Sequence, residues 1–143
     1  MTHTSQRILI ASLLLGAATA SADDKPFDAT PPDKTQGPLK EAEPLLAKAA
    51  KEWASESEHA ITIKRAYTLA KKWGYDRSET GAIIRRGVEV VVFTRDDTNK
   101  KCWQILGDVQ QEKDENGKWS SPVFDVGMTN VVTCPSVEKL PKR

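Results

Sequence analysis

The chain changes from helical to β patterning at the run Val88-Glu89-Val90-Val91-Val92-Phe93-Thr94-Arg95. β-Branched and aromatic residues dominate this run, and such residues favour extended strands. The run is apolar almost without interruption, which is typical of a strand in the centre of a sheet. We therefore predict a central strand over 88–95.

Downstream of this strand the sequence predicts an antiparallel meander. A polar turn over 96–101 leads to a second strand over about 102–113, and Asn116-Gly117 is a strong hairpin signal. With these two residues as the loop, Lys113 faces Ser120, and the apolar positions of the two strands oppose each other on one face. The predicted apolar pairs are Val109 with Phe124, Gly107 with Val126, and Ile105 with Met128.

Upstream of the central strand, apolar residues recur at helical spacing. An amphipathic helix is predicted over about 44–55, with Pro44 in its first turn. A second helix is predicted over about 58–73, with Gly74 as its C-terminal stop. Its apolar stripe is Ile63, Ala66, Tyr67, Ala70 and Trp73. A short third helix is expected between an Asp76–Glu79 cap and Gly87.

The N-terminal 22 residues have the features of a cleavable secretory signal peptide. Arg7 precedes an apolar run over 8–18, and small residues then form cleavage sites that end at Ala20 and Ala22. This run is shorter than the roughly 20 residues that a membrane span needs. We expect cleavage after Ala22 and a periplasmic or secreted protein. Residues 23–38 contain four prolines and predict a flexible spacer, which leaves 39–143 as a single domain.

Export makes a disulfide the expected state of the two cysteines, Cys102 and Cys134. The hairpin register places them on opposite faces of the sheet, where no disulfide can form. We therefore expect the last strand to bend, bulge or end near Gly127 to Asn130. The whole pattern predicts an α+β domain in which two or three N-terminal helices pack on one face of a three- or four-stranded antiparallel sheet, closed by one disulfide.

The charges of the chain suggest where it binds. Removal of residues 1–22 leaves 20 Lys+Arg and 20 Asp+Glu, because Arg7 is the only charged residue removed from the totals of 21 and 20. Residues 64–86 are nevertheless locally basic, which is typical either of a solvated surface or of a docking face for an acidic protein, a cell-wall polymer or a lipid headgroup. The candidate binding residues from this segment are Lys71, Lys72, Arg85 and Arg86.

Four tryptophans belong to the predicted domain. Trp53, Trp73 and Trp103 lie on predicted apolar faces and are assigned to the core. Trp119 follows the Asn-Gly turn, on the face opposite Phe124, and is a candidate exposed contact.

No residue is assigned a catalytic or metal-binding role. His59 is the only histidine of the mature chain and has no second histidine at metal-ligand spacing. The pairs Asp96-Asp97 and Asp114-Glu115 lie in predicted turns, where acids ordinarily serve turn formation. We expect no cofactor. A neutral, exported chain also argues against a nucleic-acid partner for the faint helix-turn-helix pattern at 70–84.

The leading hypothesis is an exported, non-enzymatic binding protein that contacts a protein or an envelope polymer, as an inhibitor, an immunity-type protein or an accessory factor. One alternative is a small-ligand carrier with a pocket between helices and sheet, lined by Tyr67, Trp73, Trp103 and Phe124. A less favoured one is a cell-envelope hydrolase that uses His59 or the turn carboxylates.

Overall fold

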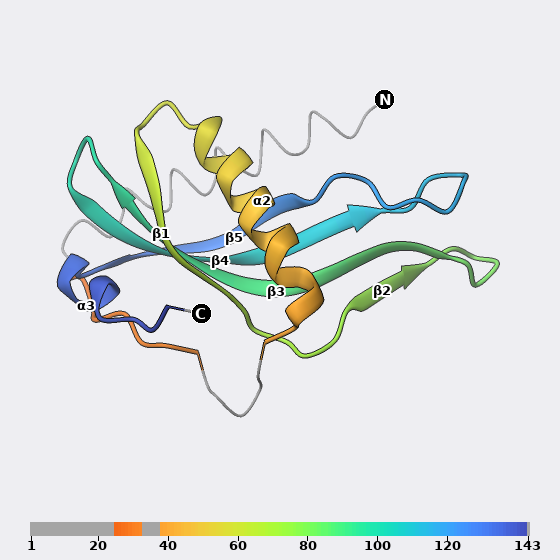
Figure 1. Cartoon of the computed structure of the whole chain (residues 1–143), viewed down its shortest axis with the longest axis horizontal. Coiled ribbons are helices and arrows are strands. Elements are labelled where there is room, and N and C mark those ends of the chain that lie inside the picture. Colours follow the sequence, from red (N-terminus) through yellow and green to blue (C-terminus); the bar gives the residue numbers. More distant parts are fainter. Residues whose placement is uncertain (1–24, 33–37, 143) are drawn as a thin grey trace.

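An antiparallel sheet with a long helix across one face forms the body of the protein (Figure 1). The computed structural model describes residues 25–32 and 38–142, so the predicted signal peptide lies outside the described residues. The elements are η1 (Lys40–Ala42), α2 (Glu43–Ser55), β1 (Ile61–Thr68), β2 (Gly74–Arg77), β3 (Ile83–Asp96), β4 (Lys101–Glu112), β5 (Val123–Val132) and α3 (Cys134–Glu138). Within the described ranges the sheet has five strands, more than predicted, and one helix packs across it rather than two or three.

Strand β3 is the centre of the sheet, as the run 88–95 predicts. It pairs with β1 and β2 along one side and with β4 along the other, while β5 pairs with β4. Alternate residues of β3 enter two separate cores. Val88, Val90 and Val92 face α2, whereas Val91 and Phe93 face the opposite side. Burial on both sides is the reason that this strand is apolar almost throughout.

The predicted first helix is confirmed as α2. Its residues Leu46, Ala49 and Ala50 are buried against the even-numbered valines of β3. Trp53, on the next turn, packs edge-on against Phe124 of β5 with ring centroids 5.5 Å apart. The two alanines present little side chain to the sheet, so the helix axis can lie close to it.

The predicted second helix is wrong, because residues 61–68 form the strand β1. A bulge lies between Ile63 and Arg65, so Ile63 and Ala66 both face α2 although they are three positions apart. The extra residue thus imitates the three-residue spacing of a helix. Tyr67 belongs to the other core, on the opposite face.

The predicted third helix is also wrong. Gly74 does not end a helix but begins β2, where it pairs with Gly87. Asp76 pairs with Arg85 in the same ladder, so it lies within a strand and does not cap a helix. The chain reverses at a turn in which Gly81 has a φ of 86°, a conformation that glycine adopts without strain.

The predicted β4–β5 register is confirmed in its middle and shifts at both ends. Val109 pairs with Phe124, and Gly107 pairs with Val126. Gly127 is then an extra residue, so Leu106 rather than Ile105 pairs with Met128. The bulge lies where the prediction placed it and brings Cys102 opposite Val132. At the hairpin end, Lys113 pairs with Trp119 and not with Ser120.

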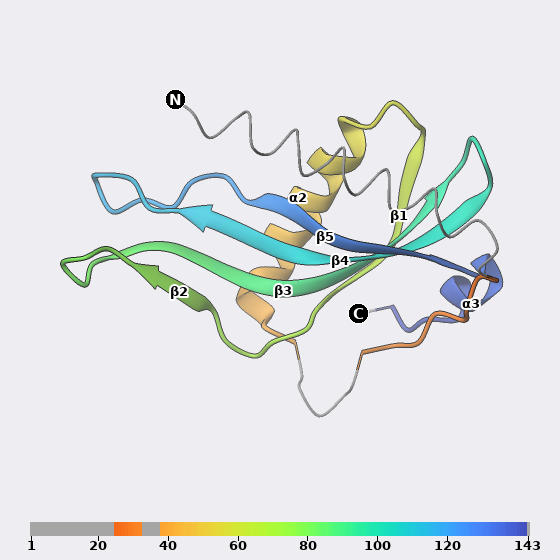
Figure 2. The same ribbon diagram turned by 180° about the vertical axis from the view of Figure 1, so that it is seen from behind.

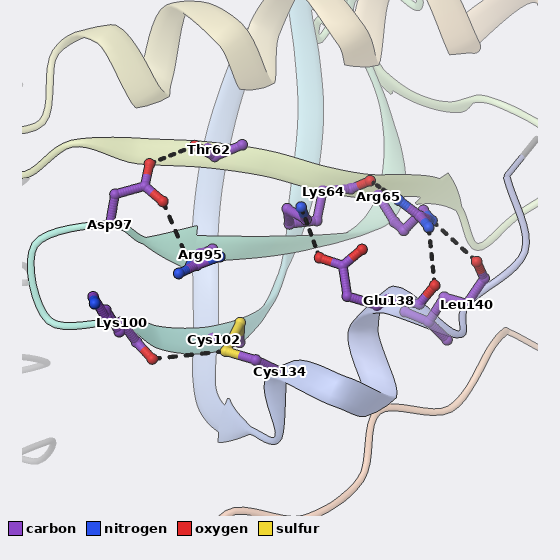
Figure 3. A network of polar contacts seen from close by, with 10 residues as sticks. All are labelled: Thr62, Lys64, Arg65, Arg95, Asp97, Lys100, Cys102, Cys134, Glu138 and Leu140. Carbon is purple, nitrogen blue, oxygen red and sulfur yellow. Dashed lines mark hydrogen bonds and ion pairs between the residues drawn. A yellow bond between two sulfur atoms is a disulfide. The ribbon is translucent and has the colours of Figure 1, made fainter.

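The predicted disulfide between Cys102 and Cys134 forms, with a Cα–Cα distance of 5.2 Å. It joins β4 to the start of α3 (Figure 3). Val137 of α3 packs on the face opposite α2 together with Leu140. Two side chains of β1 hold the other end of this segment. Lys64 Nζ lies 2.7 Å from Glu138 Oε1, and Arg65 Nε donates a 3.0 Å hydrogen bond to Leu140 O.

Part of the predicted spacer lies against the C-terminal end of β5 and the start of α3. Phe27 forms a parallel bridge to Val132, and its carbonyl accepts a 3.0 Å hydrogen bond from Thr133 N. Ala29 is buried and donates its N–H to Ser136 Oγ at 2.8 Å. Residues 27–29 are therefore docked on the domain, although the composition of 23–38 predicts a flexible segment.

Candidate functional site

The side chain of Arg86 lies between two indole rings beyond the N-terminal end of α2. Its guanidinium carbon is 4.2 Å from the centroid of Trp73 and 4.4 Å from that of Trp119. Arg86 stands on the α2 face of β3, two positions from Val88, so the stack continues the core outward along the sheet. Both indoles supply an electron-rich face to the same cation, which is a favourable arrangement for each contact.

A buried glutamine fixes the orientation of Arg86. Arg86 Nε donates a 2.9 Å hydrogen bond to Gln111 Oε1, and Gln111 Nε2 donates a 2.8 Å hydrogen bond to Ser120 O. Gln111 is only 5% exposed and lies directly across from Arg86 on β4. The hydrogen bonds from Arg86 to Gln111 and from Gln111 to Ser120 O therefore connect the stack to the backbone beside Trp119.

The hairpin loop explains how Trp119 reaches this stack. The loop is not the predicted two-residue turn, because Asp114 N donates to Lys118 O at 2.8 Å and Gly117 has a φ of 78°. Asp114 Oδ1 also accepts hydrogen bonds from Asn116 N and Lys118 N. A one-residue change of register turns a side chain to the other face. Trp119 consequently lies on the same face as Phe124, and the prediction of the opposite face is wrong.

The structure divides the predicted basic patch. Arg86 is in the stack, whereas Arg85 points to the opposite face, 3.6 Å from both Asp76 Oδ2 and Glu112 Oε1. Lys71 and Lys72 are exposed in the segment between β1 and β2. The sequence interpretation missed Tyr75, which pairs with Arg86 in the β2–β3 ladder and is 48% exposed. We call Trp73, Tyr75, Arg86 and Trp119 the Trp–Arg surface.

The helical interpretation of 58–84 concealed this surface. It placed Trp73 at the end of a helical core stripe and Tyr75 outside any element. The usable signal was the alternation Arg86, Val88, Val90, Val92, which puts Arg86 on the face of the core valines.

His59, Asp96 and Asp97, three of the groups considered for hydrolysis, are engaged in local structure. His59 Nδ1 lies 3.3 Å from Asp96 Oδ2, and Asp96 also accepts hydrogen bonds from Thr98 N and Asn99 N. Burial raises the pKa of Asp96, but these backbone N–H groups and the nearby His59 outweigh it and lower the pKa below its ordinary value. Asp97 accepts a 2.6 Å hydrogen bond from Thr62 Oγ1 (Figure 3).

A groove of about 630 Å³ runs between α2 and β1. Small side chains leave it open, and its lining is Ala47, Lys51, Ala54, Ser55, Ser57, His59, Ala60, Ile61, Ile63 and Ala66. The predicted pocket lining is not assembled here. Tyr67 lies in the core opposite α2, while Phe124 belongs to the α2-facing core, against which Trp73 and Trp103 pack.

Within residues 25–32 and 38–142, His, Cys, Asp and Glu side chains form no group that could hold a metal ion. Over the same ranges no helix combines the length and the apolar character that crossing a membrane requires. Comparisons with protein-family models, curated proteins and solved structures found no match.

Proposed function

We propose that the chain is an exported, non-catalytic binding protein that contacts a protein or an envelope polymer through the Trp–Arg surface. The observation that carries the proposal is the Trp73–Arg86–Trp119 stack with the exposed Tyr75 beside it. Tryptophan, tyrosine and arginine are the residue types that contribute most binding energy at interfaces.

The fixed geometry of the stack supports this role. Arg86 is held by Gln111 and by both indoles, so it loses little conformational freedom when a partner binds. Lys113 adds a second cation, with Nζ 5.3 Å from the Trp119 ring centroid. A partner that presents carboxylates or other polar acceptors beside a flat apolar group complements this combination.

The direct test places a photo-activated cross-linking amino acid at position 75 in the full chain, expressed with its own N-terminal segment. We expect irradiation of intact cells to give a discrete adduct with a protein or an envelope polymer. The same residue at Glu41, which is exposed on η1, is the control and should give no such adduct.

Loss of the adduct in a Trp119→Ser background would assign it to the Trp–Arg surface. Equal adducts from positions 75 and 41, or none from position 75, would contradict the proposal.

Export is part of the same proposal. The Cys102–Cys134 disulfide is compatible with an oxidising extracellular or periplasmic location. Mass spectrometry of the protein from cells should therefore give a mature chain that begins at Asp23. A full-length chain with reduced cysteines in the cytosolic fraction would contradict export.

The groove between α2 and β1 favours a small-ligand carrier as a second candidate, since its volume is within the range of small-molecule sites. We expect the purified chain to raise the fluorescence of an apolar naphthalene sulfonate probe. Ala54→Trp fills the groove and should remove the signal, whereas Lys48→Trp, on the same helix but outside the lining, should retain it. Equal signals from both variants would contradict this candidate.

A further inference from the structure

Three carboxylates stand in one row across the sheet, on the face opposite α2. Glu89 of β3 pairs with Asp108 of β4, and Asp108 pairs in turn with Asp125 of β5. Side chains of directly paired residues point to the same face, with Cβ atoms about 5 Å apart. Neighbouring strands are about 4.8 Å apart, so the row spans about 10 Å.

This row is unfavourable in the protein on its own. Like charges directly opposite each other destabilise a sheet. Among the described residues no cation forms an ion pair with any of the three carboxylates. Burial, together with Glu89 and Asp125, raises the pKa of Asp108 above its ordinary value.

Exposed apolar side chains lie on both sides of the row. The neighbouring row toward the β4–β5 hairpin contains Val123, which is 56% exposed. The neighbouring row on the other side contains Leu106 and Met128, and Met128 is 57% exposed. Figure 2 shows that α3 lies at the end of the strands away from β2. The described helices therefore leave this part of the face uncovered.

We infer that this face docks a basic segment of a partner protein, whose lysine or arginine side chains pair with the carboxylates while its apolar residues contact Val123 and Met128. We call Glu89, Asp108, Val123, Asp125 and Met128 the acidic sheet face. Its negative charge selects a cationic occupant, and the apolar flanks select a peptide over a simple polyamine. The inference concerns a different surface from the Trp–Arg surface and does not depend on it.

The probe for this inference is a short, fluorescently labelled peptide of alternating lysine and leucine, titrated with the full chain and followed by anisotropy. We expect saturable binding that weakens with salt, and none with a peptide that has glutamate in place of lysine. Glu89→Gln combined with Asp108→Asn should weaken binding roughly tenfold. Glu115→Gln, an exposed acid in the hairpin loop, is the control and should bind as the wild type does.

A second measurement separates binding from folding. Because the row is repulsive, Asp108→Asn should raise the midpoint of urea unfolding while it weakens peptide binding. Absence of saturable binding would overturn the inference, as would equal effects of Glu115→Gln and the double variant. Salt-sensitive self-association of the chain that Asp108→Asn abolishes would identify a second copy as the occupant and would also overturn it. Cross-linking from position 75 is independent of all these outcomes.

Discussion

Arg86 combines two roles that are usually separate, because it closes the end of a core and forms part of an accessible surface. Its contacts with Trp73, Trp119 and Gln111 replace the hydration that a guanidinium would otherwise keep. The neighbouring Arg85 has only ion pairs at 3.6 Å with exposed carboxylates. The two residues therefore provide a matched comparison of a stacked arginine and an arginine that is paired only with exposed carboxylates.

We predict that Arg86→Ala lowers the free energy of unfolding by about 2 kcal/mol, because both cation–π contacts are lost and Gln111 loses a donor. Arg85→Ala should change it by no more than about 0.5 kcal/mol, as is typical of exposed ion pairs. Urea denaturation followed by tryptophan fluorescence measures both. Equal losses for the two variants would show that the stack contributes nothing specific.

Three carboxyl groups make the stability depend on pH in opposite directions. The lowered pKa values of Asp96 and Glu138 mean that their contribution is present at neutral pH and is lost as the pH falls below about 4. In Glu138 the largest cause is the hydrogen bond from Lys64. Asp108 acts in the reverse sense, since its raised pKa means that the folded state binds this proton more tightly than the unfolded state.

Asp108→Asn should therefore be more stable than the wild type at neutral pH, by about 0.5–1 kcal/mol. This advantage should shrink as the pH falls through the raised pKa of Asp108, because the wild-type carboxyl then becomes neutral too. Urea denaturation of both proteins across a pH series gives the difference. An advantage that stays constant with pH would mean that charge repulsion is not its cause.

At the level of elements, the pairing of β4 with β5 depends on Gly107, where the backbones of the two strands come very close together. A Cβ at position 107 would stand 2.1 Å from Asp125 O and 3.0 Å from the ring of Phe124. At Gly87 the nearest atoms, Gln110 Cγ and Val109 O, would both be at 3.5 Å, an ordinary contact.

We predict that Gly107→Ala destabilises the fold by about 1–3 kcal/mol, because β5 must move away from β4. Gly87→Ala is the control and should be neutral or slightly stabilising. Thermal unfolding measures both variants, and hydrogen exchange should show faster amide exchange in β5 for Gly107→Ala alone. Retained protection of β5 in that variant would contradict the explanation.

Sequence reasoning identified the strands whose residue types or alternation are clear. The run 88–95 was recognised from its β-branched and aromatic residues. The pairing of Val109 with Phe124 was predicted from strand alternation and a hairpin turn, although the loop differs from the predicted two-residue turn. Strand β1 was not predicted, because its bulge places Ile63 and Ala66 on one face although they are three positions apart. Three-residue spacing of this kind is typical of a helix. Strand β2 is too short and too exposed to carry an apolar pattern at all.

The candidate surface was predicted in part for the same reason. Trp119 and Arg86 were identified by residue type, but their contact depends on the loop that shifts Lys113 opposite Trp119. The residue types alone do not predict that change of pairing in the loop.

For the molecule as a whole, the disulfide fastens the segment that closes the core opposite α2 to the interior strand β4. Cys134 begins α3, and α3 with residues 27–29 closes the core opposite α2. We predict that Cys102→Ala combined with Cys134→Ala lowers the free energy of unfolding by about 3–4 kcal/mol, from the greater freedom of the unfolded chain. Reduction of the wild type should give a similar loss, whereas the double variant should not respond to reductant. A wild type whose urea midpoint is unchanged by complete reduction would contradict this.

The alternation of β3 side chains between the two faces of the sheet also has an electrostatic consequence. Arg86 lies on one face of this strand, and Glu89, three residues later, lies on the other with Asp108 and Asp125 beside it. Although the positive and negative charges of the predicted mature chain cancel, this part of the sheet has a stacked cation on one face and three carboxylates on the other. A charged surface attracts one of these faces and repels the other. An anionic surface would therefore approach the Trp–Arg surface more readily than the acidic sheet face.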